Sequence, residues 1–162
     1  MPEHATEHQV REDEADEIAR IAELLGGYRI LRHRLAHQFD VHEFLDQGMP
    51  RAALAYLVAQ SALQQSPDFF ERALGMSRRT FQRSKHAPRK PLSKEQSGRT
   101  WKFAEILAKA IEVFGSRDEA LAWFERPALG LEQRRPIDLL ATPAGAKLVE
   151  DFLGRLEYGV YT

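Results

Sequence analysis

Nine cationic side chains are concentrated between Ser66 and Arg99, in a chain of 162 residues whose formal net charge is −1. The same stretch holds only three acids, which are Asp68, Glu71 and Glu95. The cationic residues are Arg72, Arg78, Arg79, Arg83, Lys85, Arg89, Lys90, Lys94 and Arg99. Positive charge gathered on one compact unit is typical of a protein that binds nucleic acid.

The local pattern around these cations predicts two helices joined by a tight turn. Ser66 suits an N-cap and Pro67 suits the first helical position. Apolar residues then recur at helical spacing, at Phe69, Phe70, Ala73 and Leu74. Gly75 can adopt the left-handed conformation that ends a helix, and Ser77 can cap a second helix from Arg78 to about His86. A short basic helix after such a turn indicates a helix-turn-helix, in which the second helix enters the major groove.

The residues expected to contact DNA lie on and after that second helix. Phe81 faces inward, and the outward-facing candidates are Arg78, Arg79, Thr80, Gln82, Arg83 and Lys85. Lys90 and Lys94 follow the helix and suit phosphate contacts. Glu71 and Ser84 depart from the small and apolar residues common in such units. An ordinary helical hairpin with a solvated basic face is the alternative interpretation.

Other residue patterns give no convincing catalytic or metal site. His33 and His37 are four residues apart, as are His4 and His8, but neither pair has an evident third ligand. The chain has no cysteine, which excludes disulfides, zinc-thiolate sites and thiol catalysis. The Gly26-Gly27 pair lacks the Gly-Lys-Ser/Thr ending of a phosphate loop. We therefore expect a protein that is not an enzyme and has no cofactor.

Composition and charge distribution place the chain among globular proteins. Hydrophobic residues make up 43% and charged residues 29%. No apolar run is long enough to span a bilayer, and the acidic start is unlike a signal peptide, so we expect a cytoplasmic protein with no membrane partner. Residues 1–50 carry 5 Lys/Arg and 11 Asp/Glu, whereas residues 51–100 carry 10 and 3. The near-neutral total thus combines an acidic front with a basic centre.

The hydrophobic spacing predicts an all-α fold with about eight helices. Residues 1–13 are acidic and polar, and we expect them to be disordered. Residues 14–64 are expected to form N-terminal helices with a possible role in dimerisation. The helix-turn-helix unit is assigned to residues 65–91, and a small C-terminal helical domain to residues 92–162.

The C-terminal part carries a series of spaced motifs. They are Ala120 with Trp123, Leu129-Gly130, Pro136 with Leu139-Leu140, Thr142 with Gly145, and the ending Arg155-Leu156-Glu157-Tyr158-Gly159-Val160. Together these motifs resemble the toxin-binding region of the Xre/MbcA/ParS antitoxin family. The helix predicted over 92–115 also resembles the helix that links the two parts of that family's members, so the resemblance covers about residues 65–162.

The resemblance implies an antitoxin that pairs with a RES-type toxin, an enzyme that consumes NAD or uses it to modify targets. It also implies repression of the antitoxin's own operon. We expect Arg155, Tyr158, Gly159, Val160 and Tyr161 to bind the toxin and the final residues to block its active site. Because one helix-turn-helix covers only a half-site, operator DNA is expected to bind a homodimer.

A second class of function stays open. The chain could be a stand-alone transcription regulator whose C-terminal domain only dimerises. A neighbouring gene for a RES-type toxin favours the antitoxin, and the absence of such a gene favours the regulator.

Overall fold

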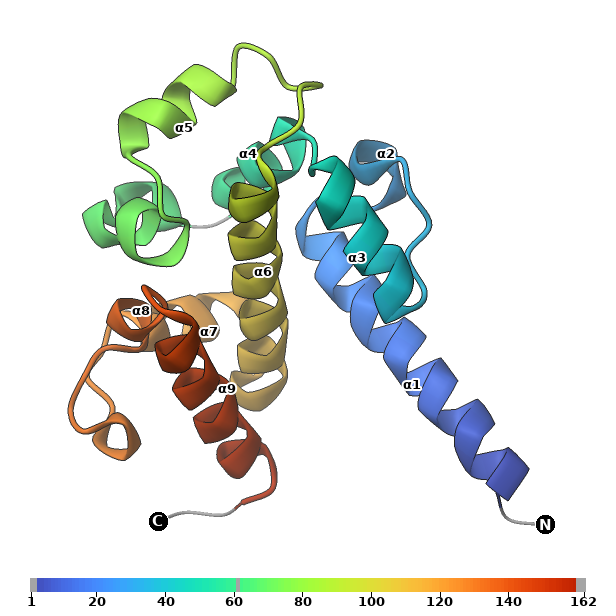
Figure 1. The fold of residues 1–162 in the computed structure, drawn as a ribbon. Coiled ribbons are helices and arrows are strands. Elements are labelled where there is room, and N and C mark those ends of the chain that lie inside the picture. Colours follow the sequence, from blue (N-terminus) through green and yellow to red (C-terminus); the bar gives the residue numbers. More distant parts are fainter. Residues whose placement is uncertain (1–2, 61, 160–162) are drawn as a thin grey trace.

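The structure is a computed structural model that describes residues 3–60 and 62–159, and the predicted all-α fold is confirmed there (Figure 1). The α-helices are α1 (Glu3–Leu24), α2 (Tyr28–Leu31), α3 (Gln38–Gln47), α4 (Arg51–Ala59), α5 (Arg78–Ser84), α6 (Lys94–Phe114), α7 (Arg117–Phe124), α8 (Pro136–Leu139) and α9 (Pro143–Glu157). Two 3-10 helices, η1 (Ala62–Gln65) and η3 (Leu129–Leu131), and one π-helix, η2 (Phe69–Ala73), complete the described elements. The described residues form isolated β-bridges but no strand.

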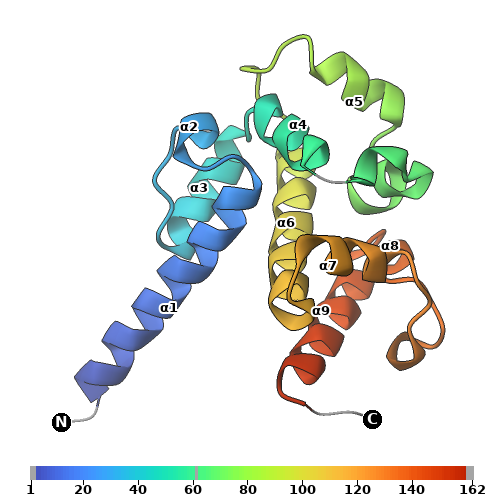
Figure 2. The same cartoon turned by 180° about the vertical axis from the view of Figure 1, so that it is seen from behind.

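Helix α6 is the central element of the fold. It contacts α1 and α3 on one side and η2, α7 and α9 on the other (Figure 1, Figure 2). Its start is fixed by a capping box in which the Ser93 hydroxyl accepts from the Gln96 N–H at 3.0 Å and the Gln96 side chain accepts from the Ser93 N–H at 3.1 Å. Its buried face includes Trp101, Phe103 and Ile106. Helices from the N-terminal and from the C-terminal parts of the chain therefore pack against one helix.

Residues 3–13, which we expected to be disordered, form the first half of α1, so that prediction is wrong for them. These residues include Glu, Gln, Arg and Ala, which favour helix even where no core covers them. The His8 ring lies 3.2 Å from the Glu12 carboxylate, and the Gln9 amide donates to Asp13 at 2.9 Å. Such pairs four residues apart support an exposed helix. Figure 1 shows this half of α1 extending away from the other helices.

The second half of α1 packs with α2 and α3 into an N-terminal unit, residues 14–47. Ile18, Ile21 and Leu25 are buried, and Arg20 pairs with Glu112 of α6 at 2.8 Å. The Asp40 carboxylate accepts the N–H groups of Ala36 and His37 at 2.9 and 3.0 Å. These backbone hydrogen bonds lower the pKa of Asp40 and fix the start of α3.

The basic unit, residues 65–91, departs from the predicted pair of regular helices. The first helix is the five-residue π-helix η2, in which the Leu74 N–H donates to the Phe69 carbonyl at 3.3 Å. The second, α5, ends at Ser84 rather than near His86. Phe69, Phe70 and Phe81 are buried as predicted, so the apolar pattern fixed the packing but not the winding of the first helix.

The C-terminal unit, residues 117–159, wraps α7, η3, α8 and α9 around one side of α6. The Trp123 ring stacks on Phe152 of α9 with centroids 6.2 Å apart and contacts Phe114 of α6 at 5.2 Å. Trp123 is therefore a core residue. None of the helices among the described residues combines the length and apolar character needed to cross a membrane.

Candidate functional site

Helix α5 has one buried face and one face that is exposed to solvent. The Ser77 hydroxyl accepts from the Thr80 N–H at 3.0 Å, which caps the helix as predicted, and it also donates to the Thr80 hydroxyl. Phe81 packs on Phe70 with ring centroids 4.9 Å apart. Ser84 is buried, and its hydroxyl donates to the Phe81 carbonyl, which satisfies the polar group that departed from the usual pattern.

The predicted DNA-contacting side chains of α5 differ in how free they are. All of them are exposed, but Arg78 donates to the Gln64 carbonyl at 2.6 Å and lies over the Phe70 ring. Lys85 lies over the Phe81 ring with its Nζ 5.0 Å from the centroid. Among residues 3–60 and 62–159, no hydrogen bond or ion pair engages the side chains of Arg79, Gln82 or Arg83. These three are the side chains most available to a ligand.

Lys90 and Lys94 lie beyond α5, and different contacts position them. The carbonyl of Lys90 accepts from the Arg51 N–H at 3.0 Å, and that of Pro88 accepts from the Ala52 N–H at 2.9 Å. These bonds hold the loop after α5 against the start of α4. Lys94 lies in the first turn of α6 and pairs with Asp46 of α3 at 2.8 Å, a bridge that also lowers the pKa of Asp46. Both ends of that bridge are exposed, so it is a weak restraint.

Arg99 belongs to the cationic cluster by sequence but not by position. Its guanidinium is half-buried and donates to backbone carbonyls of Arg72, Ala73 and Leu140. It therefore does not add to the free basic face, and sequence reasoning gave no signal of this arrangement because its partners lie 26 to 41 residues away.

Two glycines of the C-terminal motifs allow close packing. A Cβ on Gly145 would overlap the Leu139 carbonyl oxygen, and one on Gly130 would overlap the Phe152 ring. The Thr142 hydroxyl accepts from the Gly145 N–H at 3.0 Å and caps α9. The Thr-x-x-Gly and Leu-Gly motifs thus bring the end of α8 and the η3 loop onto α9.

A groove of about 230 Å³ lies between the η3 loop and α9. It is lined by Gly130, Leu131, Glu132, Arg134, Leu139, Leu148, Asp151 and Arg155. Leu129 beside it is 81% exposed and Leu148 is 55% exposed. Two loop residues without the freedom of glycine, Glu132 and Gln133, have φ of 54° and 63°, a strained left-handed conformation.

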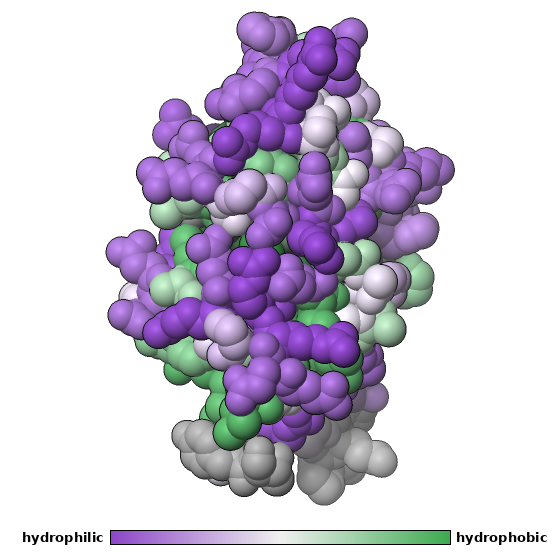
Figure 3. Space-filling view, turned by 90° about the vertical axis from the view of Figure 1, so that its left-hand side faces the viewer, coloured by the Kyte–Doolittle hydropathy of each residue, from purple (hydrophilic) through white to green (hydrophobic). Residues whose placement is uncertain are grey.

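Figure 3 looks onto the basic and C-terminal units. Hydrophilic side chains cover its upper part, and hydrophobic side chains gather in its lower half. On this face, hydrophilic side chains predominate over the basic unit, and hydrophobic side chains lie among hydrophilic ones over the C-terminal unit.

The predicted toxin-binding residues are only partly within the described chain. Arg155 is exposed on α9, with its guanidinium 5.6 Å from the Phe152 ring centroid. Tyr158 is 81% exposed, and Gly159 has φ 68°. Val160 and Tyr161 lie outside the described residues. In the part of the chain that the structure describes, no cluster of three metal-ligating side chains occurs.

The layout of a basic helix-turn-helix followed by a small helical unit defines a class of DNA-binding protein with a C-terminal partner-binding region. Two family models match these two parts. The antitoxin Xre-like helix-turn-helix domain matches residues 40–105, and the antitoxin Xre/MbcA/ParS C-terminal toxin-binding domain matches residues 109–159. The chain belongs to the Xre/MbcA/ParS antitoxin family.

Curated relatives carry the name Antitoxin Xre. The chain is 37% identical to that of Yersinia enterocolitica over 93 residues, which are 56% of this chain and 62% of the relative. It is 34% identical to that of Photorhabdus laumondii over 67 residues, 41% of this chain and 45% of the relative. It is 29% identical to that of Pseudomonas putida over 154 residues, 88% and 94% of the two chains. The first two matches thus span less than two thirds of those relatives' lengths.

Proposed function

We propose that this protein is an antitoxin that binds operator DNA through α5 and neutralises a toxin through its C-terminal unit, without catalysis of its own. The observation that carries the proposal is the separation of two surfaces on one chain. Arg79, Gln82 and Arg83 are exposed on the basic unit, and a groove lined by both leucines and charged side chains lies on the C-terminal unit. The matches to a helix-turn-helix domain and to a toxin-binding domain support the same division.

On the DNA side, Arg79, Gln82 and Arg83 contact base edges, while Lys90 and Lys94 contact phosphates. Guanidinium and amide groups suit bidentate contacts with guanine and adenine. A chain with one recognition helix covers one half-site, so the protein binds its operator as a homodimer, with residues 14–64 as the dimerisation region. Occupation of the operator represses the protein's own operon.

On the toxin side, the partner is a RES-type enzyme that uses NAD, and the residues after α9 block its active site. The exposed Leu129 and Leu148 supply apolar area, and the strained turn at Glu132 and Gln133 presents the η3 loop. Tyr158 offers a large contact area with a hydroxyl for a polar pocket wall. Blocking a pocket needs no catalytic residue on the antitoxin.

Co-expression with the product of a neighbouring RES-type gene tests this function. We expect the tagged chain to retain the toxin in a pull-down and to restore growth and the NAD level. We also expect the purified chain to shift a duplex taken from upstream of its own gene. DNA binding without retention of the toxin would favour a stand-alone regulator whose C-terminal unit only dimerises.

A further inference from the structure

The turn that sets the direction of α5 is in contact with Arg99 of α6. The turn residue Gly75 has φ 66°, and a Cβ placed on it would lie 2.7 Å from Nη1 of Arg99. The guanidinium therefore lies directly against the link between η2 and α5. A side chain packed on this turn can determine how α5 leaves the body of the protein.

The same guanidinium satisfies the open end of the π-helix. The last carbonyls of a helix have no partner within it. Nη2 of Arg99 donates to the Arg72 carbonyl at 2.7 Å, and Nε donates to the Ala73 carbonyl at 3.3 Å. Nη2 also lies 3.4 Å from the Leu140 carbonyl, at the junction of α8 and α9. One side chain thus joins the end of η2 to the C-terminal unit.

The beginning of η2 is tied to the C-terminal unit as well. Asp68, which directly precedes η2, accepts from Nη2 of Arg135 at 2.7 Å. Two further bonds from Arg135 to Asp138 orient its guanidinium and lower the pKa of Asp138. Both ends of η2 are therefore held by arginines from elsewhere in the chain.

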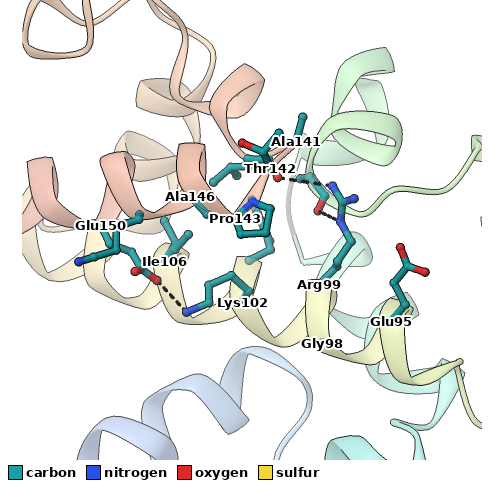
Figure 4. A pocket seen from close by; sticks show the side chains of 14 residues that line it. Glu95, Gly98, Arg99, Lys102, Ile106, Ala141, Thr142, Pro143, Ala146 and Glu150 are labelled. Atoms are coloured by element: carbon teal, nitrogen blue, oxygen red, sulfur yellow. Dashed lines mark hydrogen bonds and ion pairs between the residues drawn. The ribbon is translucent and has the colours of Figure 1, made fainter.

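Arg99 also lines a cleft. The cleft, of about 510 Å³, lies between α6 and the start of α9, with Ala73 of η2 on its wall. Figure 4 shows Arg99 between Glu95 on one side and the Lys102–Glu150 ion pair on the other. The π-helix η2 contacts α8 directly, and beside the cleft the Arg99 guanidinium adds polar contacts to η2 and to the Leu140 carbonyl.

We propose that Arg99 and Arg135 are positioning residues that fix the direction of the recognition helix through η2, so that the C-terminal unit forms part of the DNA-binding platform. Neither residue contacts DNA. The inference rests on the DNA binding proposed above and adds the means by which the two units act on each other.

The first test compares Arg99→Met with Lys102→Met in the full chain. Both variants remove one positive charge from α6, but only the first removes the contacts with η2. The assay is fluorescence anisotropy with a labelled duplex from upstream of the protein's own gene. We expect Arg99→Met to weaken binding about tenfold, which is within the range of coupling between sites, and Lys102→Met to change it by less than about twofold.

The salt dependence distinguishes positioning from lost contact with DNA. Loss of a phosphate contact lowers the slope of log K against log salt by about 1. We expect Arg99→Met to leave that slope at the wild-type value while the affinity falls. Equal affinities of the two variants, or a reduced slope for Arg99→Met alone, would overturn the proposal.

A second pair of variants keeps the test decisive if Arg99→Met melts below the assay temperature. Asp68→Asn and Glu71→Gln each remove one negative charge from the basic unit, but of these two carboxylates only that of Asp68 bonds to Arg135. Through charge alone, the loss of a carboxylate would strengthen DNA binding in both variants. We expect Glu71→Gln to bind as tightly as wild type or more tightly, and Asp68→Asn to bind roughly threefold more weakly. Tighter binding by both variants contradicts positioning, whereas a wild-type chain that does not bind the duplex contradicts the DNA-binding function itself.

Discussion

At the scale of single residues, the cations of the basic unit have different tasks. Arg79 and Arg83 have no side-chain partner among the described residues, whereas Arg78 and Lys85 lie over aromatic rings and Arg99 is bonded to backbone. The sequence shows the charge of all five but not these partners, because ring and carbonyl contacts depend on the tertiary fold. The choice of Arg79 and Arg83 as base-reading residues stays a prediction.

Replacement of Arg79 by alanine should lower affinity for the operator by about 1–3 kcal/mol and relax specificity at one base pair, because a bidentate contact is lost. Replacement of Lys94 should weaken binding to all DNA sequences alike and reduce the slope of log K against log salt by about 1. Anisotropy titrations with operator and single-base variants measure both effects. The same sequence-independent loss in Arg79→Ala and Lys94→Ala would refute the assignment.

A second residue-scale expectation concerns Gly145. Its replacement by alanine places a methyl group against the Leu139 carbonyl and should destabilise the fold by about 1–3 kcal/mol, as overpacking does. Gly154→Ala is the matched control, because Gly154 lies within the same helix and a Cβ there would meet only Lys109 Nζ at 3.6 Å. The control should stabilise α9 by about 1 kcal/mol. Urea unfolding of both variants measures the sign of each change in the free energy of unfolding. A Gly145→Ala variant as stable as wild type would mean that α8 does not pack as described.

At the scale of elements, the starts of three helices were predictable and helix winding was not. Ser77, Ser93 and Thr142 cap α5, α6 and α9 as their residue types indicate, because a cap bonds within three residues. The π-helix η2 was missed because its ends are held by Arg99 and Arg135 from distant positions. Residues 3–13 form helix despite their excess negative charge, because helix propensity and side-chain pairs four residues apart support the helix there.

The bridge between Arg135 and Asp138 gives the link between elements a pH dependence. Hydrogen bonds from Arg135 hold the pKa of Asp138 below its ordinary value. At pH values between the lowered pKa and the ordinary pKa, the folded state therefore binds fewer protons than the unfolded state. The stabilisation is present above pH about 4 and is lost as the pH falls through the lowered pKa.

Unfolding by urea at pH 7 and at pH 3 checks this expectation. We expect Asp138→Asn to be less stable than wild type at pH 7 and to approach wild type at pH 3. Asp16→Asn, at an exposed position on α1, is the control and should show no such convergence. A constant difference between Asp138→Asn and wild type across this range would exclude the bridge as its cause.

At the scale of the whole molecule, one long helix connects surfaces suited to two different partners. Helix α6 begins beside the basic unit, and the C-terminal unit packs along its length. The all-α fold and the order of the two matched domains were predictable from spacing and motifs. The contacts between the units were not, because they depend on how η2, α8 and α9 meet in space.

The separation of surfaces is tested most directly by the NAD level in cells that express the proposed RES-type toxin together with variants of this chain. We expect the chain with Arg79→Ala and Arg83→Ala, expressed from an unrelated promoter, to keep NAD at the level given by the wild-type chain. A chain that lacks residues 158–162 should leave the toxin active, so that NAD falls and growth stops, while its DNA binding is retained. Full protection of NAD by the truncated chain would contradict blockage by the C-terminal residues.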